Sequence, residues 1–391
     1  MRYDVIVVGG GPAGATAARI TAEKGLSVLL LEKFKFDREK ACGGVVQGIT
    51  LERFDLPKKV KETFERNAMG AFLCAPSGNY VKVLSEEPLG KFVWRSRFDK
   101  ALVEWAHDKG AETRELTRVS DLIIKEGFVR GVVVKSKGKT EDLEAGVVIG
   151  ADGFYSFVAR RLGLLQTKLD RIAAQYSFHM AMPEREIDEK IGDVFESYYG
   201  TPEYPANMWI SPKKEGVSVA AGIMLSEMAE MKMTLRELVS YMIKHHPIMA
   251  EKLKNAKTVL EQPSMIFYPG TVSKPHYNGA ILAGEAAGHT VAATGAGIHW
   301  SMVGGEHAAT AVANALEKDD VSEAALSEGD RLVKEEIGEY LELGMKMRAK
   351  TFDVKGREML IEGLKASEAA RKMFLEMLSG KARFTETARF W

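Results

Sequence analysis

Three glycines and one acidic residue near the N-terminus have the spacing of a dinucleotide-binding site. Gly9, Gly11 and Gly14 follow an apolar run, and Glu32 ends the next apolar run. The first glycine permits a tight turn, the second lets the backbone approach a pyrophosphate, and the third lets a helix pack closely on the strand. The phosphates then lie at the positive end of that helix. An acid at this spacing binds ribose hydroxyls, which favours FAD or NAD over NADP.

These four residues must be positioned by a strand, a turn, a helix and a second strand. We expect a strand from residue 3 to the glycines, a helix over 15–24 and a strand over 27–31. Two later segments have the same character. Residues 147–153 form an apolar strand that ends in Asp152-Gly153, and residues 280–288 form another that contains Gly284-Glu285. A simple NAD dehydrogenase has no use for the last segment, so we favour FAD.

The three segments, in this order and at these distances, resemble the FAD-dependent oxidoreductases built like para-hydroxybenzoate hydroxylase. The resemblance implies that the acid at position 285 contacts the ribityl chain, and that the turn over 294–298 holds the flavin ring. Glu285 stands where this group usually has Asp, and Ala292 where it usually has Pro. The cofactor-binding residues implied are Gly9, Gly11, Ala13, Gly14, Glu32, Lys33, Cys42, Gly43, Gly44, Arg95, Val119, Asp152, Gly284, Glu285, Gly295, Gly297 and Ile298.

Within this group the chain resembles the geranylgeranyl reductase family, whose members saturate carbon-carbon double bonds of isoprenoid chains. Residues 40–44 read Lys-Ala-Cys-Gly-Gly, where that family has a Cys-Gly element beside the flavin ring. Residues 204–212 resemble its substrate-side motif, Pro-x-x-Tyr-x-Trp-x-Phe-Pro. Trp209 and Pro212 match that motif strictly, whereas Tyr204, Asn207 and Ser211 depart from it. The FAD framework is therefore well supported, and the substrate site is supported only in part.

The reaction of that family suggests roles for two residues. An isolated alkene accepts hydride readily only if a proton reaches the other carbon, and the cation that develops is stabilised by an aromatic face. Cys42 and Trp209 are our candidate catalytic residues. The aromatic neighbours considered for Trp209 are Phe195, Tyr198 and Tyr199, and the proton donors considered are Glu196, His179 and a flavin-bound water.

Three classes of function stay open. The first is an isoprenoid double-bond reductase acting on a lipid or a quinone side chain. The second is an aromatic-ring monooxygenase on the same fold, and the third is an electron-transfer flavoprotein without an organic substrate. The electron donor, NAD(P)H or a ferredoxin-like protein, cannot be read from the sequence because no second GxGxxG is present.

Composition excludes several other classes. Lys plus Arg and Asp plus Glu number 54 each, so no overall basic field favours nucleic acid. Two cysteines argue against a disulfide-stapled fold, and the histidine spacings do not predict a metal site. No signal peptide and no apolar run of membrane-spanning length is recognised. We expect a cytoplasmic enzyme that can contact a membrane surface.

The predicted fold is α/β, with three regions. A discontinuous Rossmann-like FAD-binding domain is expected over residues 1–68, 95–165 and 266–320. A mixed β-sheet substrate domain is expected over 69–94 and 166–265, and a helical C-terminal region over 321–391. Turn residues at 77–79 and at 126–127 predict two hairpins, and the apolar period over 235–244 predicts a helix that stops near Pro247.

Overall fold

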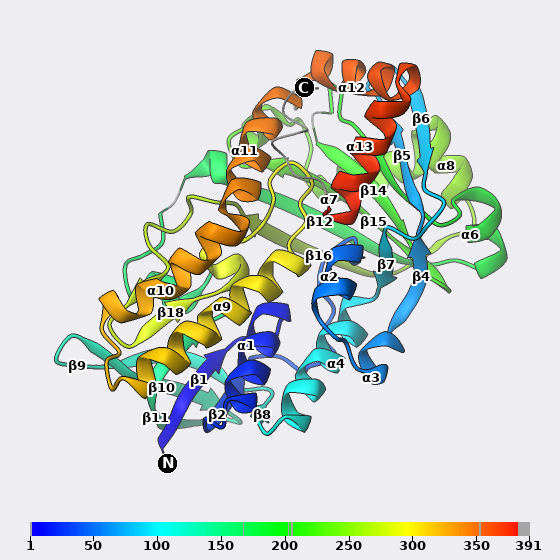
Figure 1. Cartoon of the computed structure of the whole chain (residues 1–391). Coiled ribbons are helices and arrows are strands. Elements are labelled where there is room, and N and C mark those ends of the chain that lie inside the picture. The colour runs from blue at the N-terminus through cyan, green and yellow to red at the C-terminus, as the bar shows by residue number, and fades with distance from the viewer. Residues whose placement is uncertain (1, 167, 202, 205, 352, 382–391) are drawn as a thin grey trace. The chain divides into compact units, whose positions relative to one another are not determined.

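The computed structural model describes residues 2–166, 168–201, 203–204, 206–351 and 353–381 (Figure 1). Pro205 of the aromatic motif and residues 382–391 of the predicted tail lie outside the described residues. Contacts within the chain define two compact units. The first comprises Met1–Arg38, Ser96–Arg171 and Phe267–Met345, and the second comprises Glu39–Arg95, Ile172–Ile266 and Lys346–Trp391.

The first unit is built on a sheet of eight strands among its described residues. Its order is β17-β18-β11-β1-β2-β8, and β10 joins β11 to β9 at one side. The strands are β1 (Arg2–Val8), β2 (Val28–Leu31), β8 (Glu112–Arg114), β9 (Arg118–Lys125), β10 (Phe128–Ser136), β11 (Lys139–Gly150), β17 (His276–Tyr277) and β18 (Ala280–Leu282). The strands β2, β1, β11 and β18 pair in parallel, whereas β10 pairs antiparallel with β11, and the residues of β2 and β18 are all buried. Such two-sided burial is typical of a parallel sheet.

Helices of the first unit pack where small residues permit close approach. Figure 1 shows α1 (Pro12–Glu23) beside α9 (Ile298–Glu317). A Cβ at Gly305 of α9 would lie 2.3 Å from the carbonyl oxygen of Ala13, so a larger residue there would separate the two helices. The other helices are α4 (Arg95–Asp108), α5 (Phe157–Arg161), η1 (Leu169–Arg171), η3 (Gly284–Ala287), α10 (Glu323–Val333), η4 (Lys334–Gly338) and α11 (Glu339–Thr351), of which α4 and α11 cross a unit boundary.

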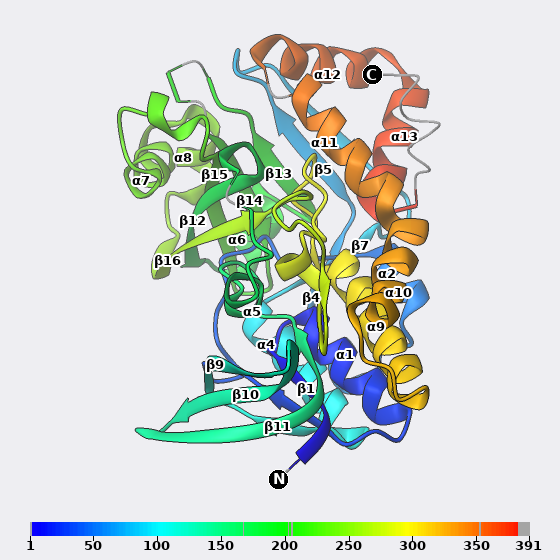
Figure 2. The same cartoon turned by 90° about the vertical axis from the view of Figure 1, so that its left-hand side faces the viewer.

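The second unit contains a mixed sheet of seven strands within the described part of the chain. The strand order is β16-β12-β15-β14-β13-β5-β6. Figure 2 labels β5 and β12 to β16 of this sheet. The strands are β5 (Gly70–Cys74), β6 (Tyr80–Leu84), β12 (Ile172–Ala181), β13 (Val194–Tyr198), β14 (Asn207–Pro212), β15 (Gly216–Met224) and β16 (Lys257–Phe267). Strand β13 pairs parallel with β5, so strands that are far apart in the sequence form one sheet.

The two faces of this sheet differ in chemistry. One face is an apolar core that includes Phe178, Ile210 and Val219 and is covered by α7 (Leu235–His245) and α8 (Pro247–Leu253). At the β5–β6 end, the opposite face packs on α12 (Val354–Ala366) and α13 (Glu368–Ser379). Along β12, β14 and β15, this second face carries mainly polar and small residues. We call the latter area the polar face; it comprises Gln175, Ser177, His179, Trp209, Ser211, Ser218, Ala220 and Gly222.

A small third sheet belongs to the second unit. Its order is β3-β7-β4, formed by β3 (Val45–Gln47), β7 (Gly90–Val93) and β4 (Phe64–Ala68). Because β3 and β4 both pair with β7, residues 39–68 cluster with the second unit, whereas the sequence placed them with the nucleotide-binding region. The remaining short helices are α2 (Gly48–Arg53), α3 (Lys58–Lys61), α6 (Glu184–Lys190) and η2 (Met228–Glu230).

The α/β class is confirmed, and both hairpins form where the turn residues predict them. Strands β9 and β10 are joined by Glu126 and Gly127, which both have positive φ as a tight two-residue hairpin turn requires. Strands β5 and β6 pair across residues 75–79. Helix α7 ends before Pro247, as predicted. None of the helices in the described ranges is long and apolar enough to cross a membrane.

Candidate functional site

The candidate nucleotide site lies at one edge of the parallel sheet in the first unit. Strands β1, β2, β11 and β18 run in the same direction, so their carboxyl ends share this edge. Gly9, Glu32, Ala151 and Gly284 follow or closely follow these four ends. Ligands of open α/β sheets bind outside the carboxyl ends of the strands. The topology therefore brings the three predicted nucleotide segments together.

Contacts between the three segments show how closely they meet. A Cβ at Gly9 would lie 2.4 Å from the carbonyl oxygen of Ala151, and one at Gly284 would lie 2.5 Å from the Ala13 Cβ. Gly153 faces Glu285, because a Cβ at Gly153 would lie 3.7 Å from Glu285 Oε2. Glycine is required at Gly9 and Gly284, where φ is also positive.

The start of α1 has the features of a phosphate cradle. Gly11 is the N-cap of α1, makes no side-chain cap bond, and precedes Pro12 in the first turn. No acidic residue occupies that turn, so the positive end of the helix is available to an anion. A Cβ at Gly11 would meet only Arg38 Nη2, at 3.7 Å, which leaves open space over the backbone. These residues fit the pyrophosphate of FAD.

Glu32 is buried at the end of β2 and organises the turn. Its Oε2 accepts a hydrogen bond from the Gly10 amide at 2.9 Å, and its Oε1 accepts one from the Phe34 amide at 3.0 Å. Arg38 lies beside it, with Nε 3.6 Å from Oε2, and Arg38 Nη1 donates to buried Asp99 at 3.0 Å. The carboxylate is therefore fixed beside the glycine turn, where a ribose is expected.

The second and third segments present acids held by backbone amides. Asp152 accepts hydrogen bonds from Ser156 Oγ at 2.6 Å and from the Phe157 amide at 2.6 Å. Glu285 Oε1 accepts a hydrogen bond from the Phe267 amide at 3.3 Å. The longer Glu285 side chain thus still stays beside the Asp152-Gly153 turn, which supports its position at the predicted ribityl contact.

The third segment continues into a turn and helix that can face a flavin ring. Gly295 has positive φ and nothing within 4 Å of its Cβ position, and Gly297 is the N-cap of α9 without a side-chain cap. Ile298, the first residue of α9, is buried. His289 supports this region, because its Nδ1 accepts from the Gly284 amide at 3.2 Å. Burial lowers the pKa of His289 to about 4, so the ring is neutral in the usual pH range.

The remaining predicted cofactor residues have varied environments. Ala13 is buried at the start of α1, and Lys33 is exposed. Arg95 is 6% exposed and begins α4. Val119 is buried in β9, where it pairs with Val134 and packs in an apolar cluster. Their contact with FAD stays a prediction.

The substrate-side candidates belong to the second unit. Trp209 projects from β14 onto the polar face, beside Gly222, whose Cβ would lie 3.3 Å from the indole Cζ3. A Cβ at Gly43 would lie 2.8 Å from Phe195 Cε2 and 3.7 Å from Trp209 Nε1. The structure therefore brings Trp209, Phe195 and the Cys42 loop, which we define as residues 42–44, to one place.

The polar face has buried polar atoms that remain unpaired among the described residues. They are Ser177 Oγ, His179 Nε2 and Trp209 Nε1. Ser177, Ala220 and Trp209 lie in one row across β12, β15 and β14. Buried polar groups are normally hydrogen-bonded, so each such atom calls for a partner, and a ligand or ordered water would supply one.

Hydrogen bonds from β14 and β15 fix the Cys42 loop. Ser218 Oγ donates to the Cys42 carbonyl oxygen at 3.3 Å, and Ser211 Oγ donates to the Gly43 carbonyl oxygen. The Gly44 amide donates to Cys42 Sγ at 3.3 Å, and the Val93 amide donates to the Gly44 carbonyl oxygen at 2.8 Å. The residue Cys42 is partly exposed, and its backbone is held in place by these bonds.

The structure adds Lys213, which the sequence analysis missed. Its side chain is 0% exposed, and Nζ donates to the Gly43 carbonyl oxygen at 2.9 Å and to Ser211 Oγ at 2.8 Å. Burial lowers the pKa of Lys213 to about 7. The one available signal was its spacing, because Trp209, Ser211 and Lys213 alternate toward the same face.

Two sequence candidates lie on the other side of this sheet. Glu196 and Tyr198 belong to the strand positions that face the apolar core, where Tyr198 donates to Glu196 at 2.6 Å and Lys252 pairs with Glu196. The expectation that Tyr198 neighbours Trp209 and that Glu196 serves as proton donor beside it is therefore wrong. Tyr199 packs instead with the cluster under α12 and α13. His179 does face the polar side, but burial lowers its pKa to about 4 and it is neutral near pH 7.

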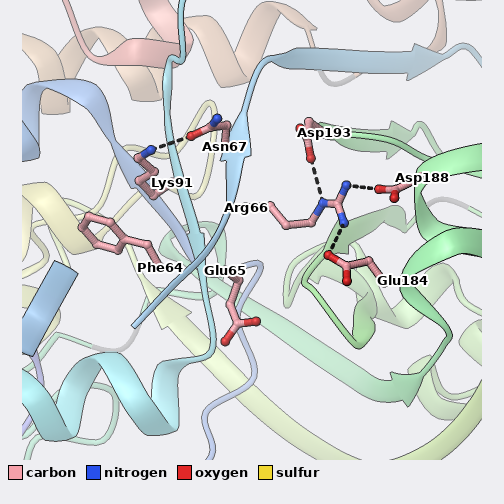
Figure 3. Close-up of a pocket in the computed structure, with 8 residues that line it drawn as sticks. All are labelled: Phe64, Glu65, Arg66, Asn67, Lys91, Glu184, Asp188 and Asp193. Atoms are coloured by element: carbon pink, nitrogen blue, oxygen red, sulfur yellow. Dashed lines mark hydrogen bonds and ion pairs between the residues drawn. The ribbon is translucent and has the colours of Figure 1, made fainter. Parts of the chain in front are cut away.

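A separate polar crevice of about 380 Å³ opens elsewhere in the second unit (Figure 3). Arg66 Nε donates to Asp193 at 2.7 Å, and its other nitrogens pair with Asp188 and Glu184 (Figure 3). These bonds tie β4 to α6 and to the residue before β13. We interpret the cluster as structural, because the single Arg66 guanidinium binds carboxylates from two neighbouring segments.

Comparison with known proteins supports this arrangement. The profile of the FAD binding domain family matches residues 2–327. A digeranylgeranylglycerophospholipid reductase of Methanosarcina acetivorans is 33% identical over 334 residues, covering 83% of this chain and 79% of the relative. Digeranylgeranylglycerophospholipid reductase 2 of Methanothermobacter thermautotrophicus is 30% identical over 389 residues, covering 97% of this chain and 96% of the relative.

Solved structures show the same fold. A geranylgeranyl bacteriochlorophyll reductase-like protein of Thermoplasma acidophilum has a TM-score of 0.83 at 24% identity, covering 96% of each chain. A halogenase solved in complex with FAD has a TM-score of 0.72 at 17% identity, covering 96% of this chain and 86% of that one. The predictions of FAD as the cofactor and of a hydroxylase-like fold are confirmed.

Gly11→Ala is expected to fold but to lose FAD. The added methyl group finds space in the protein alone and occupies the position that the pyrophosphate needs. Gly14→Ala is the matched contrast, because its Cβ would lie 1.9 Å from the Gly9 carbonyl oxygen and should impair folding. Circular dichroism and bound FAD measure the two effects. Full FAD content in Gly11→Ala would contradict the assignment.

The stability of the protein should depend on the proton of Lys213. Its folded pKa of about 7 lies below the unfolded value of about 10.4, so the unfolded chain binds more protons between these values. The free energy of unfolding, relative to Lys213→Met, should therefore rise from pH 7 to pH 9 by up to about 1.4 kcal/mol per pH unit. Thermal unfolding midpoints of wild type and Lys213→Met, measured from pH 7 to pH 9, test this prediction. A difference between the two midpoints that does not change with pH would refute it.

Proposed function

Because the chain belongs to the FAD-binding-domain family that includes the digeranylgeranylglycerophospholipid reductases, we propose that it saturates double bonds in the geranylgeranyl chains of a glycerophospholipid. It is an FAD-dependent oxidoreductase. The observation that carries the proposal is the match to one such reductase over 97% of this chain, which includes both compact units.

Each unit contributes residues with their own tasks to the proposed reaction. FAD, when bound and reduced, supplies a hydride. As one carbon of the alkene receives that hydride and the other receives a proton, the π bond breaks and two C–H bonds form. The residues at 9–14, 32 and 284–298 hold the cofactor in this proposal. The polar face and the Cys42 loop receive the alkene, with Trp209 and Phe195 providing aromatic surface for the positive charge that develops.

We propose that the Cys42 thiol donates the proton to the alkene or helps to deliver it. The residue Cys42 is partly exposed, and the loop that carries it lies against Phe195 and Trp209. Only the thiol form can donate a proton. Two other residues are poorer proton donors than Cys42. His179 has a pKa of about 4 and is neutral near pH 7. Glu196 faces the apolar core.

Substrate delivery and electron supply complete the proposal. A prenyl chain has few polar groups, so its binding energy comes from burial of apolar surface, at roughly 25 cal/mol per Å². Such a lipid resides in a membrane, and we propose peripheral contact with a membrane surface during its capture. Reducing equivalents come from NAD(P)H or a ferredoxin-like donor.

An anaerobic single-turnover reaction tests the function. Photoreduced protein is mixed with a geranylgeranylated glycerophospholipid, and we expect flavin reoxidation together with a product heavier by two mass units per reduced bond. Cys42→Ser and Trp209→Leu should each slow this step by about tenfold or more without slowing flavin photoreduction. Leu169→Ala, at an exposed position in the first unit, is the control. Reoxidation only with oxygen, coupled to hydroxylation of a phenol, would establish the monooxygenase alternative instead.

A further inference from the structure

Lys213 is a buried cation whose bonding is directed at the Cys42 loop. Its Nζ donates to the Gly43 carbonyl oxygen at 2.9 Å, to Ser211 Oγ at 2.8 Å and to the Ser211 carbonyl oxygen at 3.4 Å. An ammonium group has three N–H donors, so these contacts use all of them. The rings of Phe92 and Trp94 lie about the same ammonium, with centroids at 5.3 and 5.2 Å.

Stability alone does not explain a lysine at this position. Removing a cation from water costs free energy, and well-packed apolar residues often replace buried charges without loss of stability. Burial lowers the pKa of Lys213, whereas the negative charges of Glu65 and Glu39 act to raise it. The side chain is therefore retained at a cost, which indicates a role for its charge.

The position of the contact suggests what that role is. The Gly43 carbonyl is the central peptide group of the loop, and it receives bonds from both Lys213 and Ser211. Gly43 has no room for a side chain, since Phe195 Cε2 would lie 2.8 Å from its Cβ. Movement of this peptide would therefore move the Cys42 backbone relative to Phe195 and Trp209.

We propose that Lys213 is a positioning residue that, in its charged form and together with Ser211, fixes the Gly43 peptide and thereby the orientation of Cys42. Its ammonium acts through the loop and need not contact the substrate. A neutral amine has one N–H fewer, so deprotonation releases one of the three bonds and loosens the loop. The consequence for turnover rests on the proposed function, whereas the consequence for loop order does not.

The charged and titratable groups around Lys213 determine which of them changes protonation between pH 6 and pH 8. Glu39 and Glu65 supply negative charge, the Cys42 thiol lies nearby, and His179 is close enough for Lys213 to lower the pKa of its ring. His179 has a pKa of about 4, with Nδ1 3.6 Å from Glu39 Oε2. Between pH 6 and pH 8, Lys213 therefore titrates while His179 stays neutral.

Hydrogen exchange of residues 41–46 in the FAD-loaded protein, measured by mass spectrometry at pH 6 and pH 8, tests the proposal. After correction for intrinsic exchange, Lys213→Met should exchange about tenfold faster than wild type at pH 6. The ratio should be smaller at pH 8 than at pH 6, because the neutral amine of wild type then keeps only two of the three bonds. Lys252→Met is the matched control, since Lys252 pairs with Glu196 on the opposite face of the sheet and should leave this segment unchanged.

Two results would overturn the proposal. A ratio near one at pH 6 would show that Lys213 does not hold the loop, and an equal increase at both pH values would show a packing role without charge. If Lys213→Met fails to fold, Ser211→Ala keeps the cation and should still show faster exchange at pH 8 than at pH 6. Absence of that pH effect in both Ser211→Ala and wild type would refute the proposal.

Lipid reduction provides the kinetic readout. In wild type, kcat for the alkene step should fall as pH rises through about 7, whereas Lys213→Met should be slow and lack this transition. The exchange experiment contains no lipid, so it can succeed if the lipid assignment fails. Conversely, if Lys213→Met reduces the lipid with the same pH transition as wild type, that result would support the proposed function and contradict the proposed role of Lys213.

Discussion

Close approach of backbone segments at the end of β1 is the constraint on which the first unit depends. A Cβ at Gly9 would lie 2.4 Å from the Ala151 carbonyl oxygen, and a Cβ at Gly14 would lie 1.9 Å from the Gly9 carbonyl oxygen. These contacts place the start of α1 against the ends of β11 and β18. Any larger side chain would push apart the strands whose ends form the nucleotide edge, so fold and cofactor site share one requirement.

The second unit separates its apolar side chains from its polar ones. Its sheet keeps the large apolar residues on the side of α7 and α8, and places small and polar residues on the other. Trp209 and Phe195 contribute aromatic surface at one edge of this polar face. A rigid aromatic surface and a fixed loop can position a bound group.

The sequence predicted those parts that local rules determine. The Gly9–Gly14 turn, the Glu126-Gly127 hairpin and the end of α7 each follow from residues close together in the chain. It could not predict which residues of β13 face the apolar core, so Tyr198 stood beside Phe195 and Tyr199 as a possible neighbour of Trp209. Lys213 was missed for a similar reason. Two adjacent lysines in a hairpin turn are normally exposed to solvent, and the burial of Lys213 follows only from the pairing of β14 with β15.

The central claim is that the prenyl chain lies on the polar face beside Trp209. Photo-crosslinking with a geranylgeranyl lipid that carries a diazirine within the chain tests this directly. The account predicts labelled peptides from β13 to β15, with labelling suppressed by excess unmodified lipid. Labelling confined to the crevice around Arg66, or to the outer surface of α12 and α13, would contradict it.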